Sequence, residues 1–315
     1  MDPATTRVIF MGSPAFAEPS LRALNSAGYL IPLVVTQPDK PAGRGSRLRP
    51  PPVKALAQDL GLDTFQPQTL KSPEVAERFR AARPDVIVVA AYGKIIPQAL
   101  LDIPARGPLN VHASLLPRWR GASPVAAAIL EGDSVTGVSI MEVVQKMDAG
   151  PVLARAEVPM EPTDTTGTLE PRLAARGAEL LLDILPAWYD GTIKAEPQNE
   201  SQATYCSLIS KEDGHIPANA SAVQAERMVR AYNPWPGAFV IYRGSRLAIW
   251  RARVEDLPDD ASPGTLFDHN REPAIAFHDG LLVLEEVQRQ GAKRLSGRDF
   301  LNGERGQLAP EVQFR

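Results

Sequence analysis

The sequence of 315 residues is poor in cysteine and in long apolar runs. Its single cysteine, Cys206, excludes an internal disulfide, and with only four histidines we expect no structural zinc site. The first residues lack the apolar core of a signal peptide, and runs such as Val86 to Ala91 are too short to cross a bilayer. We therefore expect a cytoplasmic protein with no membrane association and no metal.

The chain also lacks an excess of positive charge and the glycine pattern of dinucleotide-binding proteins. Its net charge of -3 predicts neither nucleic-acid nor membrane binding. Only Gly12 stands where G-x-G-x-x-G would begin, which argues against an NAD-dependent dehydrogenase. Hydrophobic residues are plentiful, at 44% of the chain against 23% charged, so a large core divided between two domains is expected.

The first half of the chain alternates strand and helix patterns. An apolar run at 7–11 precedes a helical pattern that reaches Ala27, with Ser13 suited to cap the helix and Pro14 to its first position. A second apolar run follows at 30–35, and this order predicts an α/β fold with a mostly parallel sheet. We further expect an amphipathic segment near 52–60, helices at 73–82, 123–131 and 163–185, the last ending at Pro186, and strands at 85–90, 135–144 and 152–158.

Residues 36–54 interrupt this alternation with a basic segment rich in proline and glycine. These residue types disfavour regular structure, so a long exposed loop is expected. Five basic residues against one acid suit contacts to the phosphates of a polyanion, although such a run can also be plain surface. The basic residues are Lys40, Arg44, Arg47, Arg49 and Lys54, and the acid is Asp39.

The segment 108–121 carries the strongest chemical signal. Asn110 and His112 lie two residues apart, which places both on one face of a strand. An amide can donate to a developing oxyanion and an imidazole can move a proton, but strand capping and a core histidine explain the same residues. Asp148, in a turn before Ala-Gly-Pro, could orient the imidazole or accept a proton, or simply form the turn. Tyr92, after another strand, is better explained as a packed aromatic than as a ligand contact.

The second half reads as a linker followed by a small β domain. Residues 190–206 are polar and punctuated by glycine and proline, as linkers often are. From Ser207 onward, 14 basic residues balance 15 acidic ones, so no basic stripe is visible. The pattern predicts a helix at 221–231, a turn at 233–237, and short strands at 238–242, 246–254, 274–277 and 280–288, which together favour a small antiparallel barrel.

Several of these segments together resemble the methionyl-tRNA formyltransferase family over nearly the whole chain. The opening turn at 10–17, the basic loop and the Asn110 to Gly121 segment all resemble the family, and Asp148 follows His112 by 36 residues as its third catalytic residue does. The central segment is shared with other enzymes that use 10-formyltetrahydrofolate, whereas the basic loop and C-terminal motifs single out the tRNA enzymes. These C-terminal motifs lie at 203–205, 209–213, 233–237 and 298–303.

The resemblance implies a Rossmann-like formyl-transfer domain at 1–189, a linker at 190–206 and an OB-like barrel at 207–315 that contributes to tRNA binding. It implies formyl transfer from 10-formyltetrahydrofolate to the α-amine of methionyl initiator tRNA for translation initiation, leaving tetrahydrofolate. We also expect a monomer. By resemblance the catalytic residues are Asn110, His112 and Asp148, the folate contacts are Ser114, Leu115, Leu116 and Pro117, and the tRNA contacts are Arg44, Arg47 and Arg49.

Three other functions share part of this pattern. A formyltransferase acting on a small amine, such as a sugar nucleotide or glycinamide ribonucleotide, would need the three catalytic residues but not the basic loop. A formyltetrahydrofolate hydrolase would direct water to the same carbon and release formate. An inactive RNA-binding module would keep the barrel without needing all three catalytic residues.

Overall fold

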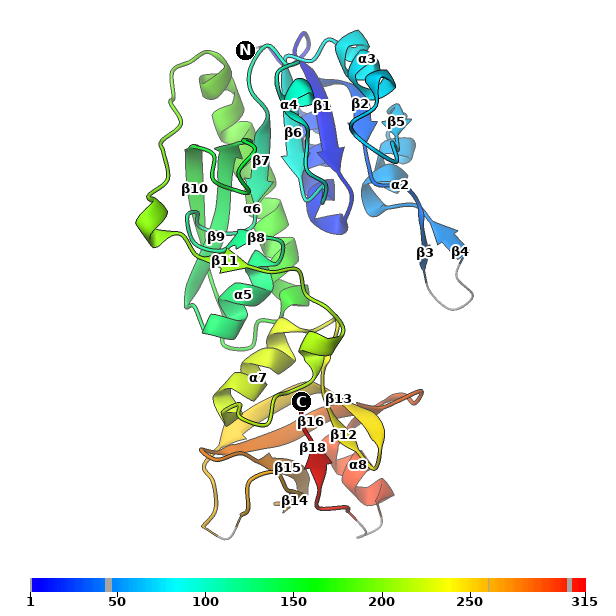
Figure 1. The fold of residues 1–315 in the computed structure, drawn as a ribbon, viewed down its shortest axis with the longest axis vertical. Helices are drawn as coiled ribbons and strands as arrows, with labels where there is room; N and C mark the ends of the chain where they lie inside the picture. The colour runs from blue at the N-terminus through cyan, green and yellow to red at the C-terminus, as the bar shows by residue number, and fades with distance from the viewer. Residues whose placement is uncertain (1, 43–46, 260, 305–307) are drawn as a thin grey trace. The chain divides into compact units, whose positions relative to one another are not determined.

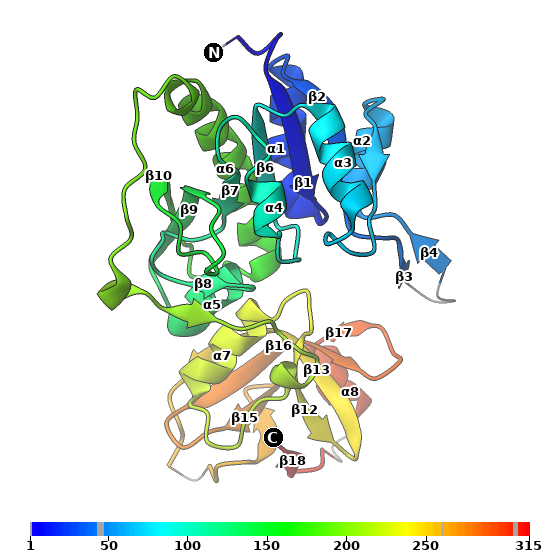
Figure 2. The same cartoon turned by 45° about the horizontal axis from the view of Figure 1, so that its top comes forward.

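The computed structural model describes residues 2–42, 47–259, 261–304 and 308–315 (Figure 1, Figure 2). Its internal contacts divide the chain into two units, which are described separately. The first unit comprises Met1–Pro124, Val135–Pro159 and Glu170–Cys206, and the second comprises Val125–Ser134, Met160–Leu169 and Ser207–Arg315.

A mostly parallel sheet forms the centre of the first unit. Within the described residues it has seven strands in the order β10-β9-β7-β6-β1-β2-β5. The strands from β7 to β5 in this order pair in parallel, and β9 pairs antiparallel with both of its neighbours, β7 and β10, so the predicted α/β class is confirmed. The strands are β1 (Arg7–Gly12), β2 (Leu30–Val35), β5 (Thr64–Phe65), β6 (Val86–Ala90), β7 (Leu109–His112), β9 (Val135–Glu142) and β10 (Val152–Pro159).

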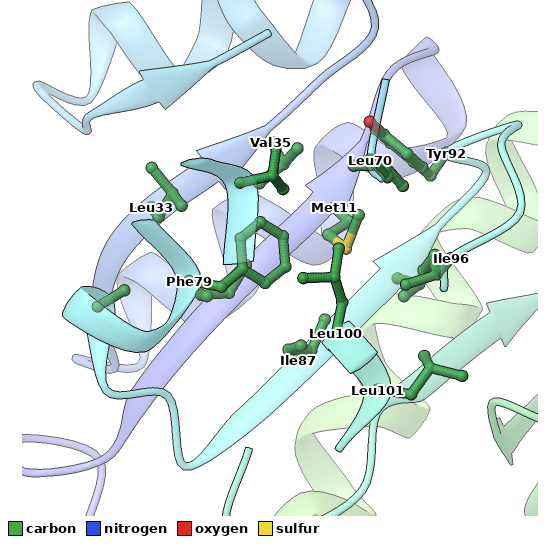
Figure 3. Close-up of a cluster of buried hydrophobic side chains, with 14 residues drawn as sticks. Met11, Leu33, Val35, Leu70, Phe79, Ile87, Tyr92, Ile96, Leu100 and Leu101 are labelled. Carbon is green, nitrogen blue, oxygen red and sulfur yellow. The ribbon is translucent and has the colours of Figure 1, made fainter. Parts of the chain in front are cut away.

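Apolar side chains of two helices join a buried cluster with one face of this sheet. Figure 3 shows Phe79 and Leu100 lying with Met11 and Ile87, and Tyr92 belongs to the same cluster. Tyr92 is 1% exposed, which confirms its prediction as a packed aromatic, and burial raises the pKa of its hydroxyl to about 12. No helix in the described part of the chain is long and apolar enough to cross a membrane. The helices before residue 190 are α1 (Glu18–Ser26), α2 (Pro52–Asp59), α3 (Pro73–Ala82), α4 (Gln98–Leu101), α5 (Pro124–Glu131) and α6 (Thr166–Tyr189).

Two predicted helix boundaries are wrong. Ser13 does not cap a helix: a 3₁₀ turn at Ala15–Ala17 intervenes, and the Ser13 hydroxyl accepts a hydrogen bond from the Gln37 amide. The helix α6 also continues past Pro186 to Tyr189. A proline in the last turn removes only one backbone donor, and the buried Trp188 keeps that turn packed.

The basic segment contains regular structure, contrary to the prediction. Strands β3 (Lys40–Ala42) and β4 (Arg47–Arg49) form an antiparallel hairpin that extends away from the large sheet in Figure 1 and Figure 2. Both strands are edges, where the missing amide hydrogen of Pro41 is tolerated. The predicted exposure holds for the described side chains at its ends, including Lys40 and Arg49.

The second unit is built on an antiparallel sheet, with the order β14-β15-β16-β13-β12-β18 in its described residues and β17 paired to β16. The Leu266 amide donates to the Pro310 carbonyl, and a bridge joins Thr265 to Glu311, so the two ends of this order meet as in a small barrel. Its elements are α7 (Ala222–Ala231), β12 (Ala238–Tyr242), β13 (Ser245–Glu255), β14 (Leu266–His269), β15 (Glu272–Ala276), β16 (Leu281–Arg289), β17 (Arg294–Ser296), α8 (Gly297–Gly303) and β18 (Val312–Gln313).

Candidate active site

Strand β7 carries Asn110 and His112 to the carboxyl edge of the parallel strands, where ligands of open α/β sheets bind. Because side chains alternate along a strand, these two share one face and Val111 points to the other. On that other side, Gly177 of α6 approaches so closely that a Cβ there would lie 2.7 Å from Val111 Cγ1. Helix α6 therefore covers the face opposite to the polar pair.

The His112 imidazole is buried, with 6% of the residue exposed, and its orientation is fixed. Its Nε2 lies 2.9 Å from the carbonyl oxygen of Trp119. Because a carbonyl only accepts, Nε2 carries the proton, and in the neutral ring Nδ1 keeps its lone pair. Nδ1 lies 3.8 Å from Asp148 Oδ2, which is too long for a direct hydrogen bond. At this distance the carboxylate would still attract a protonated imidazole.

The Asp148 carboxylate is held from the other side by a backbone donor. Its Oδ2 accepts a hydrogen bond of 2.8 Å from the Gly121 amide. Asp148 and Trp119 both adopt left-handed backbone conformations, with φ of +47° and +59°. Such conformations cost about 1–3 kcal/mol each and persist where surrounding contacts enforce them, which is typical of functional sites.

Asn110 completes the group of predicted catalytic residues. It is half-buried, and its side-chain amide makes no hydrogen bond to any residue within the described ranges. The structure thus brings His112 and Asp148 together beside the strand face that also carries Asn110. We call the Asn110 amide uncommitted because it makes no hydrogen bond within the described residues. Among described side chains, no cluster of three or more His, Cys, Asp and Glu residues could hold a metal ion.

The predicted folate loop, Ser114 to Pro117, is anchored tightly to the sheet. The Ser139 hydroxyl donates to the Ser114 carbonyl at 2.7 Å and accepts from the Leu116 amide at 3.0 Å. Leu116 is 1% exposed and packs in a cluster with Met141 and Val152. Its side chain therefore holds the loop, while Leu115 and Pro117 remain partly exposed.

Residues in the predicted linker, which the sequence reasoning gave no role, complete the site. Strand β11 (Tyr205–Cys206) pairs in parallel with β8 (Arg120–Gly121). The Thr204 hydroxyl accepts from the Trp119 amide at 2.9 Å, and Gln198 donates to the Asp148 carbonyl at 2.8 Å. We call residues 196–206 the strap. The match of residues 203–205 to the family was the one sequence signal for it.

Glu200, in the middle of the strap, forms an ion pair with a fully buried arginine. Arg120 is 0% exposed, and its guanidinium lies 3.0 Å from Glu200, which also contacts Lys146 at 2.7 Å. Hydrogen bonds from Arg120 and then Lys146 lower the pKa of Glu200 to about 2.

This depressed pKa predicts a pH-dependent contribution to stability. The Glu200 carboxylate should stabilise the fold fully above the ordinary glutamate pKa of 4.5, and this stabilisation should disappear as pH falls through about 2. We expect the difference in thermal unfolding midpoint between the wild type and Glu200→Gln to be constant from pH 8 to pH 5 and to shrink below that range. The control is Glu179→Gln, which removes an exposed ion pair on a helix. The difference in unfolding midpoint between the wild type and this variant should not follow the same pH dependence. A difference that stays constant down to pH 2.5 would contradict this assignment.

The three predicted tRNA-binding arginines are only partly described. Arg44 lies outside the described residues, Arg47 is described by its backbone in β4, and the Arg49 side chain is exposed. The loop's acid, Asp39, is 2.9 Å from Lys54, and hydrogen bonds from Lys54 and Gln66 lower the pKa of Asp39. The negative charge of Asp39 is therefore balanced by Lys54 within the segment, and the basic residues of the hairpin keep their positive charge.

Comparisons with known proteins define the class to which this fold and site belong. Residues 6–185 match the family described as Formyl transferase, and residues 208–305 match the formyl transferase C-terminal domain. The chain belongs to the formyl transferase family.

Curated relatives narrow this to one branch. The chain is 47% identical to the methionyl-tRNA formyltransferase of Chloroflexus aggregans, covering 97% of this chain and 99% of the relative. It is 46% identical to that of Methylococcus capsulatus, covering 94% and 96%. The chain is thus a member of the methionyl-tRNA formyltransferases within the family.

Solved structures share the fold at low sequence identity. WlaRD, a sugar 3N-formyl transferase, aligns with a TM-score of 0.65 and 14% identity, covering 91% of this chain and 99% of its own. HypX from Aquifex aeolicus in complex with tetrahydrofolic acid aligns with a TM-score of 0.62 and 19% identity. That match covers 95% of this chain but 47% of HypX, so this chain corresponds to about half of that protein.

Proposed function

We propose that this chain transfers the formyl group of 10-formyltetrahydrofolate to the α-amine of methionyl initiator tRNA. The observation that carries this is the grouping of His112, Asp148 and the uncommitted Asn110 amide at the carboxyl edge of the sheet, in a chain of this branch. We assign residues 1–189 to formyl transfer and 207–315 to a C-terminal domain that assists tRNA binding, in a monomeric cytoplasmic enzyme.

The geometry suggests a role for each catalytic residue. The amine nitrogen attacks the formyl carbon, and the Asn110 amide donates a hydrogen bond to the formyl oxygen as negative charge develops there. His112 Nδ1 accepts the amine proton, and the Asp148 carboxylate stabilises the resulting imidazolium. The bond from carbon to the folate nitrogen then breaks as the formyl carbonyl re-forms, and that nitrogen takes the proton held by His112, which restores the neutral imidazole. Since the Trp119 carbonyl already orients the ring, Asp148 acts here through its charge.

The anchored loop fits a wall for the folate co-substrate. Its partly exposed residues Leu115 and Pro117 offer apolar surface to a flat heterocycle, whereas Ser114 and Leu116 hold the loop in place. This division of roles keeps all four predicted residues in the folate site but gives direct contact to two of them.

One assay tests the proposed reaction against its rivals. Purified protein would be given 10-formyltetrahydrofolate with charged initiator tRNA, with small amines such as an amino sugar nucleotide, or with neither, while formate release is followed. We expect formylated methionyl-tRNA and little free formate. Efficient formylation of a small amine alone, or formate release without an acceptor, would support the corresponding rival.

The basic hairpin is proposed to grip the phosphates of the tRNA near its acceptor end. Replacing Arg44, Arg47 and Arg49 with alanine should lower kcat/KM for charged tRNA and leave tetrahydrofolate affinity unchanged. The slope of log affinity for tRNA against log salt should become shallower by about 0.7–0.9 for each phosphate that the protein no longer neutralises, because fewer counterions are released. Binding measured between 50 and 300 mM salt would check this.

A matched control separates local binding from net charge. Alanine at the exposed Lys71, Arg80 and Arg83 changes the charge equally but lies outside the hairpin. If both triple variants weaken tRNA binding alike, the hairpin is not a specific binding site.

A further inference from the structure

We propose that Gln198 is a positioning residue that holds the Asp148 turn for formyl transfer, an inference that rests on the proposed function. Its Nε2 donates to the carbonyl oxygens of Asp148 at 2.8 Å and Gly150 at 2.7 Å. Its Oε1 accepts from Arg120 Nε at 3.0 Å. Both amide hydrogens and the amide oxygen are thus engaged, and one side chain ties the Asp148 turn to the residue that precedes Gly121.

Other contacts also hold this turn: the Gln145 side chain donates to the Ile96 carbonyl at 3.1 Å, Lys146 pairs with Glu200 at 2.7 Å, and the Ala149 amide donates to the Lys146 carbonyl at 3.3 Å. Asp148 has φ of +47°, and the three residues before it are exposed. On its other side, Gly150 lies so close to the Glu142 carbonyl that a Cβ there would be 1.8 Å from that oxygen. After Asp148 the turn has this close backbone contact, and Gln198 adds two hydrogen bonds there, to the carbonyls of Asp148 and Gly150.

Gln198 and Gly121 hold Asp148 at two different points. Gln198 fixes the backbone carbonyl of Asp148, and the Gly121 amide fixes its carboxylate. The position of Gln198 is itself set on both sides, because Glu196 and Val152 exchange backbone hydrogen bonds of 2.8 Å and Glu200 pairs with Arg120. The strap therefore fixes the position of Gln198, and Gln198 in turn helps to fix the position of the Asp148 carboxylate relative to His112.

This arrangement requires an amide at position 198. Gln198→Ala would leave the carbonyls of Asp148 and Gly150 without these donors. Gln198→Glu, of the same shape, would also place a carboxylate against those carbonyls, although Arg120 could still pair with it. We expect the Asp148 carboxylate to shift relative to His112 in both variants, more so in the second. Because Gln198 contacts the turn and not the proposed substrates, turnover should change and substrate affinity should not.

The test measures kcat and KM for both substrates in the full-length chain, corrected for the active fraction. We expect kcat to fall by about tenfold in Gln198→Ala and about a hundredfold in Gln198→Glu, with each KM within about twofold of the wild type. Gln202→Glu is the matched control, since Gln202 is exposed on the same strap, and it should keep wild-type kinetics.

A double-mutant cycle distinguishes positioning from a purely structural role. Asp148→Asn removes the charge through which Gln198 is proposed to act, so adding Gln198→Ala to it should lower kcat no further. Equal losses in both backgrounds, or unchanged kcat in Gln198→Ala and Gln198→Glu, would overturn the inference. If the wild type does not formylate methionyl-tRNA, or Asp148→Asn keeps full turnover, the proposed function fails instead.

Discussion

Asp148→Asn should lower kcat for formyl transfer by about a hundred- to a thousandfold while the fold stays intact. Asparagine has the shape of aspartate, and its side-chain oxygen can still accept the hydrogen bond from the Gly121 amide. The substitution therefore removes the negative charge 3.8 Å from His112 Nδ1 and little else. Single-turnover rates at saturating substrate, with unfolding midpoints measured in parallel, would separate chemistry from stability.

The control for this charge change is Asp59→Asn. Asp59 is exposed at the end of α2, so its neutralisation should leave turnover near the wild-type value. Near-normal turnover in correctly folded Asp148→Asn would remove Asp148 from the catalytic residues. His112→Ala is less informative, because it also removes the imidazole that donates to the Trp119 carbonyl.

Gly121→Ala should disrupt both the site and the strap. Gly121 has φ of +122°, and a Cβ there would lie 2.1 Å from the Cys206 carbonyl oxygen. Backbone cannot retreat as a flexible side chain can, so β8 and β11 would have to separate and the donor to Asp148 would move. We expect the free energy of unfolding to fall by about 2 kcal/mol or more. A displacement of about 1 Å should lower turnover by about a hundredfold.

Two glycines provide controls for the separate causes. Gly61 has φ of +68° but nothing within 4 Å of a Cβ, so Gly61→Ala reports backbone strain alone. Gly107 has neither positive φ nor a close neighbour, so Gly107→Ala should be nearly neutral. Denaturant unfolding and formylation rates of the three variants would test this order. If the free energy of unfolding of Gly121→Ala were no lower than that of Gly61→Ala, the strap would be able to move away from the added Cβ at little cost.

The sequence alone determined the elements whose signals are local. Apolar runs bounded by turns predicted β2 and α3 at the residues where they lie, since hydrophobic periodicity and proline positions act within a few residues. The same period of two placed Asn110 and His112 on one strand face. The spacing of His112 and Asp148 along the chain matched the family and so made Asp148 a candidate catalytic residue. That spacing gave no physical reason for the two side chains to lie close together.

Only the tertiary structure decided which distant residues complete the site. Residues 190–206 have the composition of a linker, yet Gln198, Glu200 and Thr204 bind the backbone and side chains around Asp148 and Trp119. Composition cannot reveal these contacts, because a polar side chain can hydrogen-bond to water as well as to protein. Which of the two it does depends on whether the fold places a matching donor or acceptor beside it. Pairing of Lys40–Ala42 with Arg47–Arg49 makes part of the basic segment a hairpin, and the Ser13 hydroxyl accepts from the Gln37 backbone amide instead of capping a helix. Local propensity sets which elements form, and long-range hydrogen bonds decide what their polar residues do.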